Sequence, residues 1–304
     1  SDVDKAKNFI KEQGAPIVIK ADGLAAGKGV IIAETLDDAY ATAEDMLSGN
    51  AFGEAGHEIV VEQFLNGEEL SYFALADGKT ILPLTSAQDH KRAFDGDAGP
   101  NTGGMGAYSP AHLMNDALEE KILKRIIEPT ISGMAKDGNP FTGVLFAGIM
   151  VVDGEPFLIE HNARFGDPEC QTLMLRMRVG VLAVLDAAAH GDLASVKDSV
   201  SWRKENALCV VMAANGYPGS YEKNTVISNL EDTAEIKNVT VFHAGTAKND
   251  KGEIVSVGGR VLGVTATGND VAEAQRRAYM GVNKINWPDG FCRKDIGWRA
   301  VDAS

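Results

Sequence analysis

The sequence predicts an α+β protein built from two domains. Its 304 residues correspond to about two domains of average size. Short apolar runs typical of paired strands are interspersed with longer segments of helical periodicity. A polar segment without either pattern, residues 191–205, separates the two parts. We therefore expect one domain over residues 1–195 and a smaller α+β domain over residues 200–304.

Local patterns predict each element of the first domain. Apolar runs bounded by turn residues predict strands, and apolar residues three or four apart predict helices. Thr35 and Asp37 are predicted to cap the second helix. Ser86–Pro110 has little apolar periodicity and many glycines, which predicts a long functional loop. The expected helices are 1–13, 38–47, 117–136 and 169–190, and the expected strands are 17–20, 30–33, 58–62, 69–75, 80–84, 144–152 and 156–162.

The same patterns continue in the second domain. Four apolar runs predict strands, and the helical spacing that follows them predicts one long helix. The expected strands are 207–214, 239–247, 254–257 and 260–267, and the expected helix covers residues 270–285.

The charge and the cysteines exclude several classes of protein. A net charge of −14 argues against a nucleic-acid polymer or an anionic membrane as the partner, because both select clustered Lys and Arg. The three cysteines, an odd number without a CxxC pair, indicate neither a disulfide framework nor a thiolate zinc site. No apolar run approaches the length of a membrane span. We expect a cytoplasmic protein.

A glycine-rich loop between two short strands is the first candidate site. Gly23, Gly27 and Gly29 would let backbone N–H groups approach an anion, and Lys20 and Lys28 would supply positive charge to phosphates. A Walker-type loop is excluded, because a glycine rather than Ser or Thr follows the lysine and a strand rather than a helix comes next. The alternative is a flexible hairpin with a surface lysine.

Two strand ends carry further polar groups. Glu62, Gln63, Phe64 and Leu65 could hold an adenine by backbone groups and an apolar flank, and Glu69 could accept from ribose hydroxyls. The alternative is an ordinary strand end with solvated acids.

A second strand end offers hard oxygen ligands. Glu160 and Asn162 share one face of their strand, and their oxygens suit Mg²⁺. Arg164 could then bind a phosphate in a bidentate manner. The alternative is a surface pair of Glu and Arg.

The long loop is a second candidate anion site. It combines Asp89, Lys91 and Arg92 with the glycine-containing run Asn101, Thr102, Gly103 and Gly104. The alternative is a mobile surface loop, which its length and glycine density disfavour.

Taken in order, these motifs resemble the phosphoribosylamine–glycine ligase family of ATP-grasp enzymes in purine biosynthesis. The resemblance spreads over nearly the whole chain. It implies an ATP-grasp fold, in which two α+β subdomains sandwich ATP, with a flap subdomain at about residues 14–65 and a small C-terminal α+β domain. The matching stretches are Gly14–Gly29, Gln88–Pro110, Asn162–Glu169 and Phe291–Gly297.

The resemblance also implies a reaction and roles for residues. Glycine is joined to 5-phospho-β-D-ribosylamine while ATP becomes ADP and phosphate, through a glycyl phosphate. Nucleotide contacts fall on Lys20, Gly23, Gly27, Lys28, Gly29, Glu62–Leu65 and Glu69, and Mg²⁺ or Mn²⁺ ligands on Glu160 and Asn162. Arg164, Lys28 and Asp167 would be catalytic, and Asp89, Lys91, Arg92, Asn101–Gly104 and Arg260 would face the substrates. A surface arginine is the alternative for Arg260.

The chain departs from this family in one large respect. The resemblance implies a further N-terminal domain of roughly a hundred residues that helps bind the phosphoribosylamine, and we expect this domain to be missing from the given sequence. We therefore keep a second hypothesis, a module that binds Mg-ATP without turnover. A phosphotransferase on an unrelated fold predicts a Walker or kinase loop, which the sequence does not contain. We expect a monomer.

Overall fold

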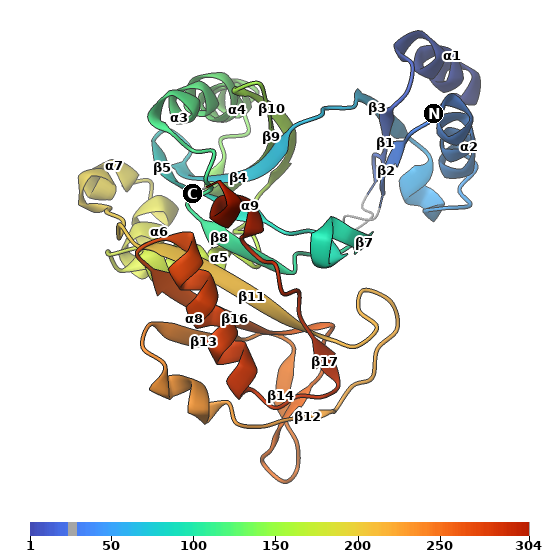
Figure 1. Cartoon of the computed structure of the whole chain (residues 1–304). Helices are drawn as coiled ribbons and strands as arrows, with labels where there is room; N and C mark the ends of the chain where they lie inside the picture. The colour runs from blue at the N-terminus through green and yellow to red at the C-terminus, as the bar shows by residue number, and fades with distance from the viewer. Residues whose placement is uncertain (24–28, 304) are drawn as a thin grey trace. The chain divides into compact units, whose positions relative to one another are not determined.

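The computed structural model describes residues 1–23 and 29–303, which form two compact units (Figure 1). The N-terminal unit comprises Ser1–Asn66, and the large unit begins at Gly67. Gly27 and Lys28, two residues of the predicted phosphate loop, lie outside the described residues. In the described part of the chain, none of the helices has the length and apolar character needed to cross a bilayer.

The N-terminal unit is a three-stranded antiparallel sheet covered by two helices. The strand order is β2-β1-β3, so the central strand is the one that leads into the glycine loop. Asp2 and Thr35 accept hydrogen bonds from Lys5 N and Asp38 N, which confirms the predicted cap Thr35, whereas Asp37 is not a cap and lies in the first turn of α2. The elements are α1 (Val3–Gln13), β1 (Ile17–Ala21), β2 (Val30–Ala33), α2 (Leu36–Leu47) and β3 (Ile59–Gln63).

A long antiparallel sheet is the framework of the large unit. Its main path runs β10-β9-β4-β5-β8-β11-β16-β13, and β17 pairs with β11 beside this path. The strands are β4 (Glu68–Asp77), β5 (Ile81–Asp89), β8 (Gly106–Ser109), β9 (Thr142–Val152), β10 (Glu155–Asn162), β11 (Asn206–Ala214), β13 (Val239–His243), β16 (Arg260–Gly268) and β17 (Gly290–Phe291).

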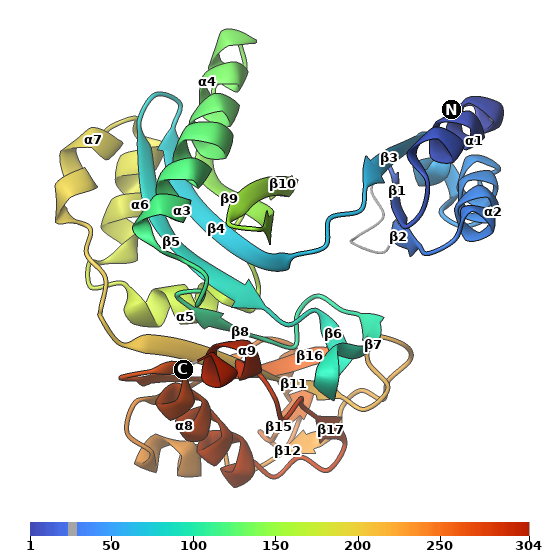
Figure 2. The same ribbon diagram turned by 45° about the horizontal axis from the view of Figure 1, so that its top comes forward.

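Helices cover both faces of the first half of this sheet (Figure 2). On one face, Leu118, Ile122 and Ile131 pack against Tyr72 and Ile149. On the other face, Leu173 and Val184 join a core that contains Phe73 and Phe146. The first layer is α3 (Asp116–Ile122), the π-helical turn η3 (Leu123–Ile127) and α4 (Glu128–Lys136), and the second is α5 (Glu169–Arg176), α6 (Val181–Ala189) and α7 (Leu193–Val196).

The second half of the sheet is packed by a single long helix. Ala274 and Ala278 of α8 (Val271–Lys284) pack with Leu208 and Val210 of β11, and Asp270 caps the helix through Glu273 N. A small sheet completes this part, formed by β12 (Val226–Ile227), β14 (Thr246–Lys248) and β15 (Ile254–Ser256). The last helix is α9 (Trp298–Asp302).

Most predicted elements are confirmed, and three predictions of elements need correction. Residues 86–110 are not one long loop, because β5 extends to Asp89 and β6 (Arg92–Phe94), β7 (Ala98–Asn101) and β8 follow. The predicted helix over 169–190 breaks at the extended residue Met177, before Gly180. The predicted strand over 239–247 ends at His243 and resumes as β14. The predicted helix over 117–136 is confirmed, and it contains a π-helical turn before Pro129, which has no N–H to donate.

A buried arginine ties the β6–β7 hairpin to the C-terminal segment. The Arg293 side chain is fully buried and pairs with Asp97 at 2.9 Å and with Asp295 at 2.8 Å. It also donates to Arg92 O at 3.1 Å. The two acids in turn hold Arg299 and Gly96 N. Removing a buried charge from such a cluster leaves its partners uncompensated.

Arg293→Leu is therefore expected to lower the free energy of unfolding by about 3–5 kcal/mol. Urea denaturation followed by tryptophan fluorescence measures this directly, because Trp202, Trp287 and Trp298 all belong to the large unit. Arg276→Leu is the matched control, since its side chain is 66% exposed. Equal stability of the two variants would contradict the structural role of the buried cluster.

The same cluster predicts an acid-sensitive contribution to stability. Burial by itself raises the pKa of Asp295, but hydrogen bonds from Arg293 and Gly96 outweigh it and lower the pKa from its ordinary value of 3.8. The ionised carboxylate therefore stabilises the fold above about pH 4, and this contribution is lost as the pH falls through the lowered pKa. The stability gap between wild type and Asp295→Asn should be present at pH 7 and narrow toward pH 3. A stability difference between the two proteins that widens in acid would contradict this role of the Asp295 carboxylate.

Candidate active site

In the N-terminal unit, the structure brings the predicted phosphate lysine next to the predicted adenine strand. Lys20 Nζ lies 2.5 Å from a carboxylate oxygen of Glu62, because β1 and β3 are neighbours in the sheet. The base of the glycine loop is closed by the hydrogen bond from Ala21 N to Gly29 O at 2.8 Å. Gly23 N donates to Ala55 O at 3.0 Å, so the described ends of the loop are held by backbone bonds.

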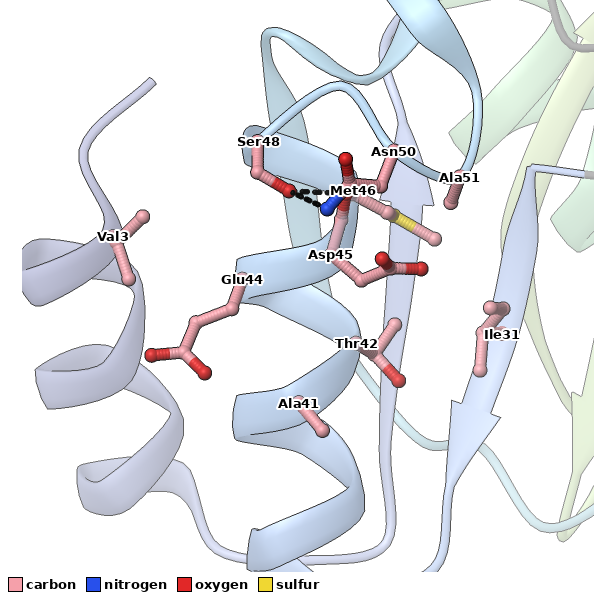
Figure 3. Close-up of a pocket in the computed structure, with 10 residues that line it drawn as sticks. All are labelled: Val3, Ile31, Ala41, Thr42, Glu44, Asp45, Met46, Ser48, Asn50 and Ala51. Atoms are coloured by element: carbon pink, nitrogen blue, oxygen red, sulfur yellow. Dashed lines mark hydrogen bonds between the residues drawn. The ribbon is translucent and has the colours of Figure 1, made fainter.

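The residues that follow β3 line a small hollow of the N-terminal unit. Gln63 and Phe64 border a cavity of about 260 Å³, and Phe64 and Leu65 are half-buried. A larger hollow of about 770 Å³ lies beside α1, α2 and β2 (Figure 3). No residue singled out from sequence borders the larger hollow, so its size alone does not mark the site.

In the large unit, Lys91 lies among carboxylates. It forms an ion pair with Glu69, and both side chains are about one-third exposed. Burial by itself lowers the pKa of Lys91, but the charges of Glu69, Asp89 and Glu160 outweigh it, and the pKa is raised. Lys91 is therefore a permanent cation that holds several of the predicted site acids in one neighbourhood.

Asp89 and Glu169 form a second, more enclosed group. Ser71 Oγ donates to Glu169 Oε1 at 3.0 Å, while Asp89 Oδ1 is enclosed and has no hydrogen-bond partner among the described residues. Burial raises the pKa of both carboxyl groups, and the charge of Glu169 further raises that of Asp89. Gly104, at φ +110°, packs against Asp89, and a Cβ there would lie 2.7 Å from Asp89 Oδ1 and 2.5 Å from Pro168 Cδ.

Glu169 was not predicted to be a site residue. It lies in the stretch Asn162–Glu169 that carries the family resemblance, but its position at the start of α5 gives no local indication of burial. Only 3% of its surface is exposed, which is rare for a glutamate.

The predicted metal ligands are adjacent at the end of β10. Asn162 Nδ2 lies 3.3 Å from Glu160 Oε1, and a bulge after Leu158 places Glu160 opposite Gly148. The Asn162 Oδ1 atom and the second Glu160 oxygen are hard ligands suited to Mg²⁺, which also retains waters. No group of three or more His, Cys, Asp or Glu in the described ranges could hold a metal ion, so a bound ion would need oxygens from water or from a nucleotide.

The predicted catalytic residues Arg164 and Asp167 follow this strand. Arg164 is exposed and donates to Phe165 O at 2.8 Å. Asp167 is also exposed, yet both of its carboxylate oxygens have partners: Gln171 Nε2 at 3.1 Å and Arg260 Nη2 at 3.0 Å. Gln171 was not predicted to take part in the site.

The substrate-side residues predicted from sequence lie together through the β6–β7 hairpin. Asn101 pairs with Arg92 in the strand register, and Arg92 Nη1 donates to Gly99 O at 2.8 Å. Thr102 donates to Lys91 O from both its N–H, at 2.7 Å, and its hydroxyl, at 2.8 Å. The two sequence stretches of this predicted site, residues 89–92 and 101–104, therefore lie side by side at the β6–β7 hairpin.

Two family models match this chain. The model of the phosphoribosylglycinamide synthetase ATP-grasp (A) domain matches residues 1–170, and that of the C domain matches residues 207–299. These two ranges contain every site residue predicted from the sequence.

Relatives of known sequence match over almost the whole chain. A chloroplastic phosphoribosylamine–glycine ligase of Arabidopsis thaliana is 57% identical over 99% of this chain, which spans 57% of that relative's length. A phosphoribosylamine–glycine ligase of Agrobacterium fabrum is 58% identical over 98% of this chain, which spans 69% of it.

Comparison with solved structures supports the same family. The phosphoribosylamine–glycine ligase of Thermotoga maritima superposes with a TM-score of 0.87 at 34% identity, covering 97% of this chain and 72% of that one. A biotin carboxylase domain of Hydrogenobacter thermophilus shares only the fold, with a TM-score of 0.70 at 15% identity over 96% of this chain and 61% of that one. With the family models and close relatives, this likeness shows that the chain has an ATP-grasp fold and belongs to the phosphoribosylglycinamide synthetase (phosphoribosylamine–glycine ligase) family.

Proposed function

We propose that this chain contributes the ATP-dependent ligation of glycine to 5-phospho-β-D-ribosylamine, giving glycinamide ribonucleotide, ADP and phosphate. One observation carries the proposal. In the large unit, the carboxylates of Glu69, Asp89 and Glu160 lie around the ammonium group of Lys91. Close relatives that bear the name of this ligase support it.

The proposed chemistry needs positioning more than a protein nucleophile. The glycine carboxylate attacks the γ-phosphorus of ATP, ADP leaves, and a glycyl phosphate results. The ribosylamine nitrogen then attacks the acyl carbon, and phosphate leaves. In-line geometry and charge neutralisation supply most of the rate in such transfers.

Each site residue has a proposed role in this reaction. A bound Mg²⁺ or Mn²⁺ ion would neutralise phosphate charge, and Glu160 and Asn162 would hold it. Arg164 and Asp167 would orient the acyl phosphate, with Lys28 at the terminal phosphate. Lys20, Gly23, Gly27, Gly29, Glu62–Leu65 and Glu69 would hold the nucleotide, and Asp89, Lys91, Arg92 and Asn101–Gly104 would face the substrates.

The domain division, location and assembly are also proposals. The boundary between residues 195 and 200 is supported by the gap between the two family-model matches. A cytoplasmic location suits three cysteines that are all free, although the Arabidopsis relative is named as chloroplastic. A monomeric state remains a prediction.

The alternative is a chain that binds Mg-ATP without turning it over, because the chain spans only 57% of the Arabidopsis relative. Phosphate release assayed with ATP, glycine and freshly prepared phosphoribosylamine separates the two. ADP formation that depends on both substrates supports the ligase. ATP binding without phosphate release supports the binding module.

Glu160→Ala is expected to remove the part of the ATP affinity that depends on magnesium. The loss should be roughly 10–100-fold or more, since even residues that only orient a metal ligand have effects of that order. Glu155→Ala is the control, because Glu155 lies on the same strand and is paired with Lys121. Calorimetric titration of ATP at several magnesium concentrations measures the effect. Unchanged affinity across the magnesium series would exclude Glu160 as a ligand.

Lys28→Met is expected to weaken the binding of ATP more than the binding of ADP. A charge-assisted contact contributes about 1.5–3 kcal/mol, which corresponds to roughly 10–150-fold in affinity, and only ATP presents the terminal phosphate. Lys11→Met, on the exposed end of α1, is the control. If competition binding finds that ATP and ADP lose affinity equally, Lys28 does not contact the γ-phosphate.

A further inference from the structure

The guanidinium of Arg260, at the start of β16, is occupied by protein acceptors. Its Nη1 atom lies 2.6 Å from Gly103 O, 3.3 Å from Gly104 O and 2.6 Å from Asp167 O. Its Nη2 atom lies 3.0 Å from Asp167 Oδ2. The side chain is 22% exposed, so it is largely withdrawn from solvent. One arginine therefore joins two segments of the candidate site.

Arg260 is one of two groups that orient the Asp167 carboxylate. The Asp167 side chain is 52% exposed, and an exposed aspartate ordinarily samples several rotamers. Here Arg260 holds Oδ2 from β16, and Gln171 Nε2 holds Oδ1 from the first turn of α5. Two donors on different elements leave the carboxylate one orientation.

The Gly103–Gly104 segment is held from the same side. Gly103 N donates to the hydroxyl of Tyr217 at 3.1 Å. The Arg260 guanidinium packs directly on Gly103, where an added Cβ would lie 3.1 Å from Arg260 Cζ. Tyr217 and Arg260 both follow residue 206, whereas the segment they hold belongs to the region matched by the ATP-grasp model.

We infer that Arg260 is a positioning residue, which fixes the Asp167 carboxylate relative to Gly103 and Gly104 and acts on the reaction through them. This inference rests on the proposed function of those residues. It differs from the expectation of a phosphoribosyl contact, because a phosphate bound bidentately by Arg260 would have to displace the four acceptors already present. Lysine cannot replace the arginine, since a point charge lacks the planar fork that reaches both segments.

Hydrogen–deuterium exchange of the whole chain tests the positioning role without requiring turnover. In Arg260→Ala and Arg260→Lys, peptides covering residues 102–106 and 165–170 should exchange several-fold faster than in wild type. Peptides from α8 and the β11 core should be unchanged, which shows that the variants remain folded. Arg276→Ala is the matched control, because it removes an arginine that is 66% exposed from the same part of the chain. Unchanged exchange in both site segments would overturn the inference.

Turnover separates positioning from substrate contact. Because misplacement of reacting groups can cost up to roughly 100-fold, Arg260→Lys should lower kcat by up to that factor while the KM for phosphoribosylamine stays within a few-fold. In the double variant with Asp167→Asn, the loss of kcat should be smaller than the product of the two single losses, as expected for residues that act together. A rise in KM alone, with additive effects in the double variant, would overturn the inference in favour of a direct contact. If wild type shows no turnover, the proposed function fails, and the exchange measurement still decides the role of Arg260.

Discussion

The candidate site of the large unit depends on a four-residue strand that is paired on both sides. β8 pairs with β5 through Gln88 and Asp89, and with β11 through residues 207–210. All four of its residues are buried, and a Cβ at Gly106 would lie 2.6 Å from Cys209 O. This pairing makes one continuous sheet from the regions matched by the two family models. Just before β8, Gly104 lies against Asp89 at the end of β5 and accepts a hydrogen bond from Arg260 at the start of β16.

Electrostatics explain how an acidic chain can hold a site for anions. The net charge is −14, yet Lys91 and Arg260 in the candidate site each have specific acceptors. Lys91 remains protonated because three carboxylates surround it, and Arg260 is held by carbonyls and one carboxylate. The raised pKa values of Asp89 and Glu169 show the cost of enclosing two acids together. Such an arrangement suits a small substrate better than an extended polyanion.

Elements with a strong local pattern were predictable. The Thr35 cap, the paired strands β4 and β5 and the long helix α8 follow from residue spacing and side-chain chemistry alone. Residues 86–110 were not predictable as strands, because β6, β7 and β8 have only three or four residues each and the glycines in β7 and β8 hide the alternation of a strand. The helix break at Met177 was missed for another reason. Met177 forms a β-bridge with Trp202, a contact that local sequence does not indicate.

By itself, the sequence determined the family, the ATP-grasp fold and the chemical types at the site: glycines for close approach, lysines for phosphates, and Glu160 with Asn162 on one strand face. Only the tertiary structure decided which groups meet. The burial of Glu169 against Ser71, the ion pair of Lys91 with Glu69 and the contact of Arg260 with Gly103 join residues 22 to 157 positions apart. The physical reason is that these contacts depend on the register of neighbouring strands, which packing of the whole sheet sets and no local pattern encodes.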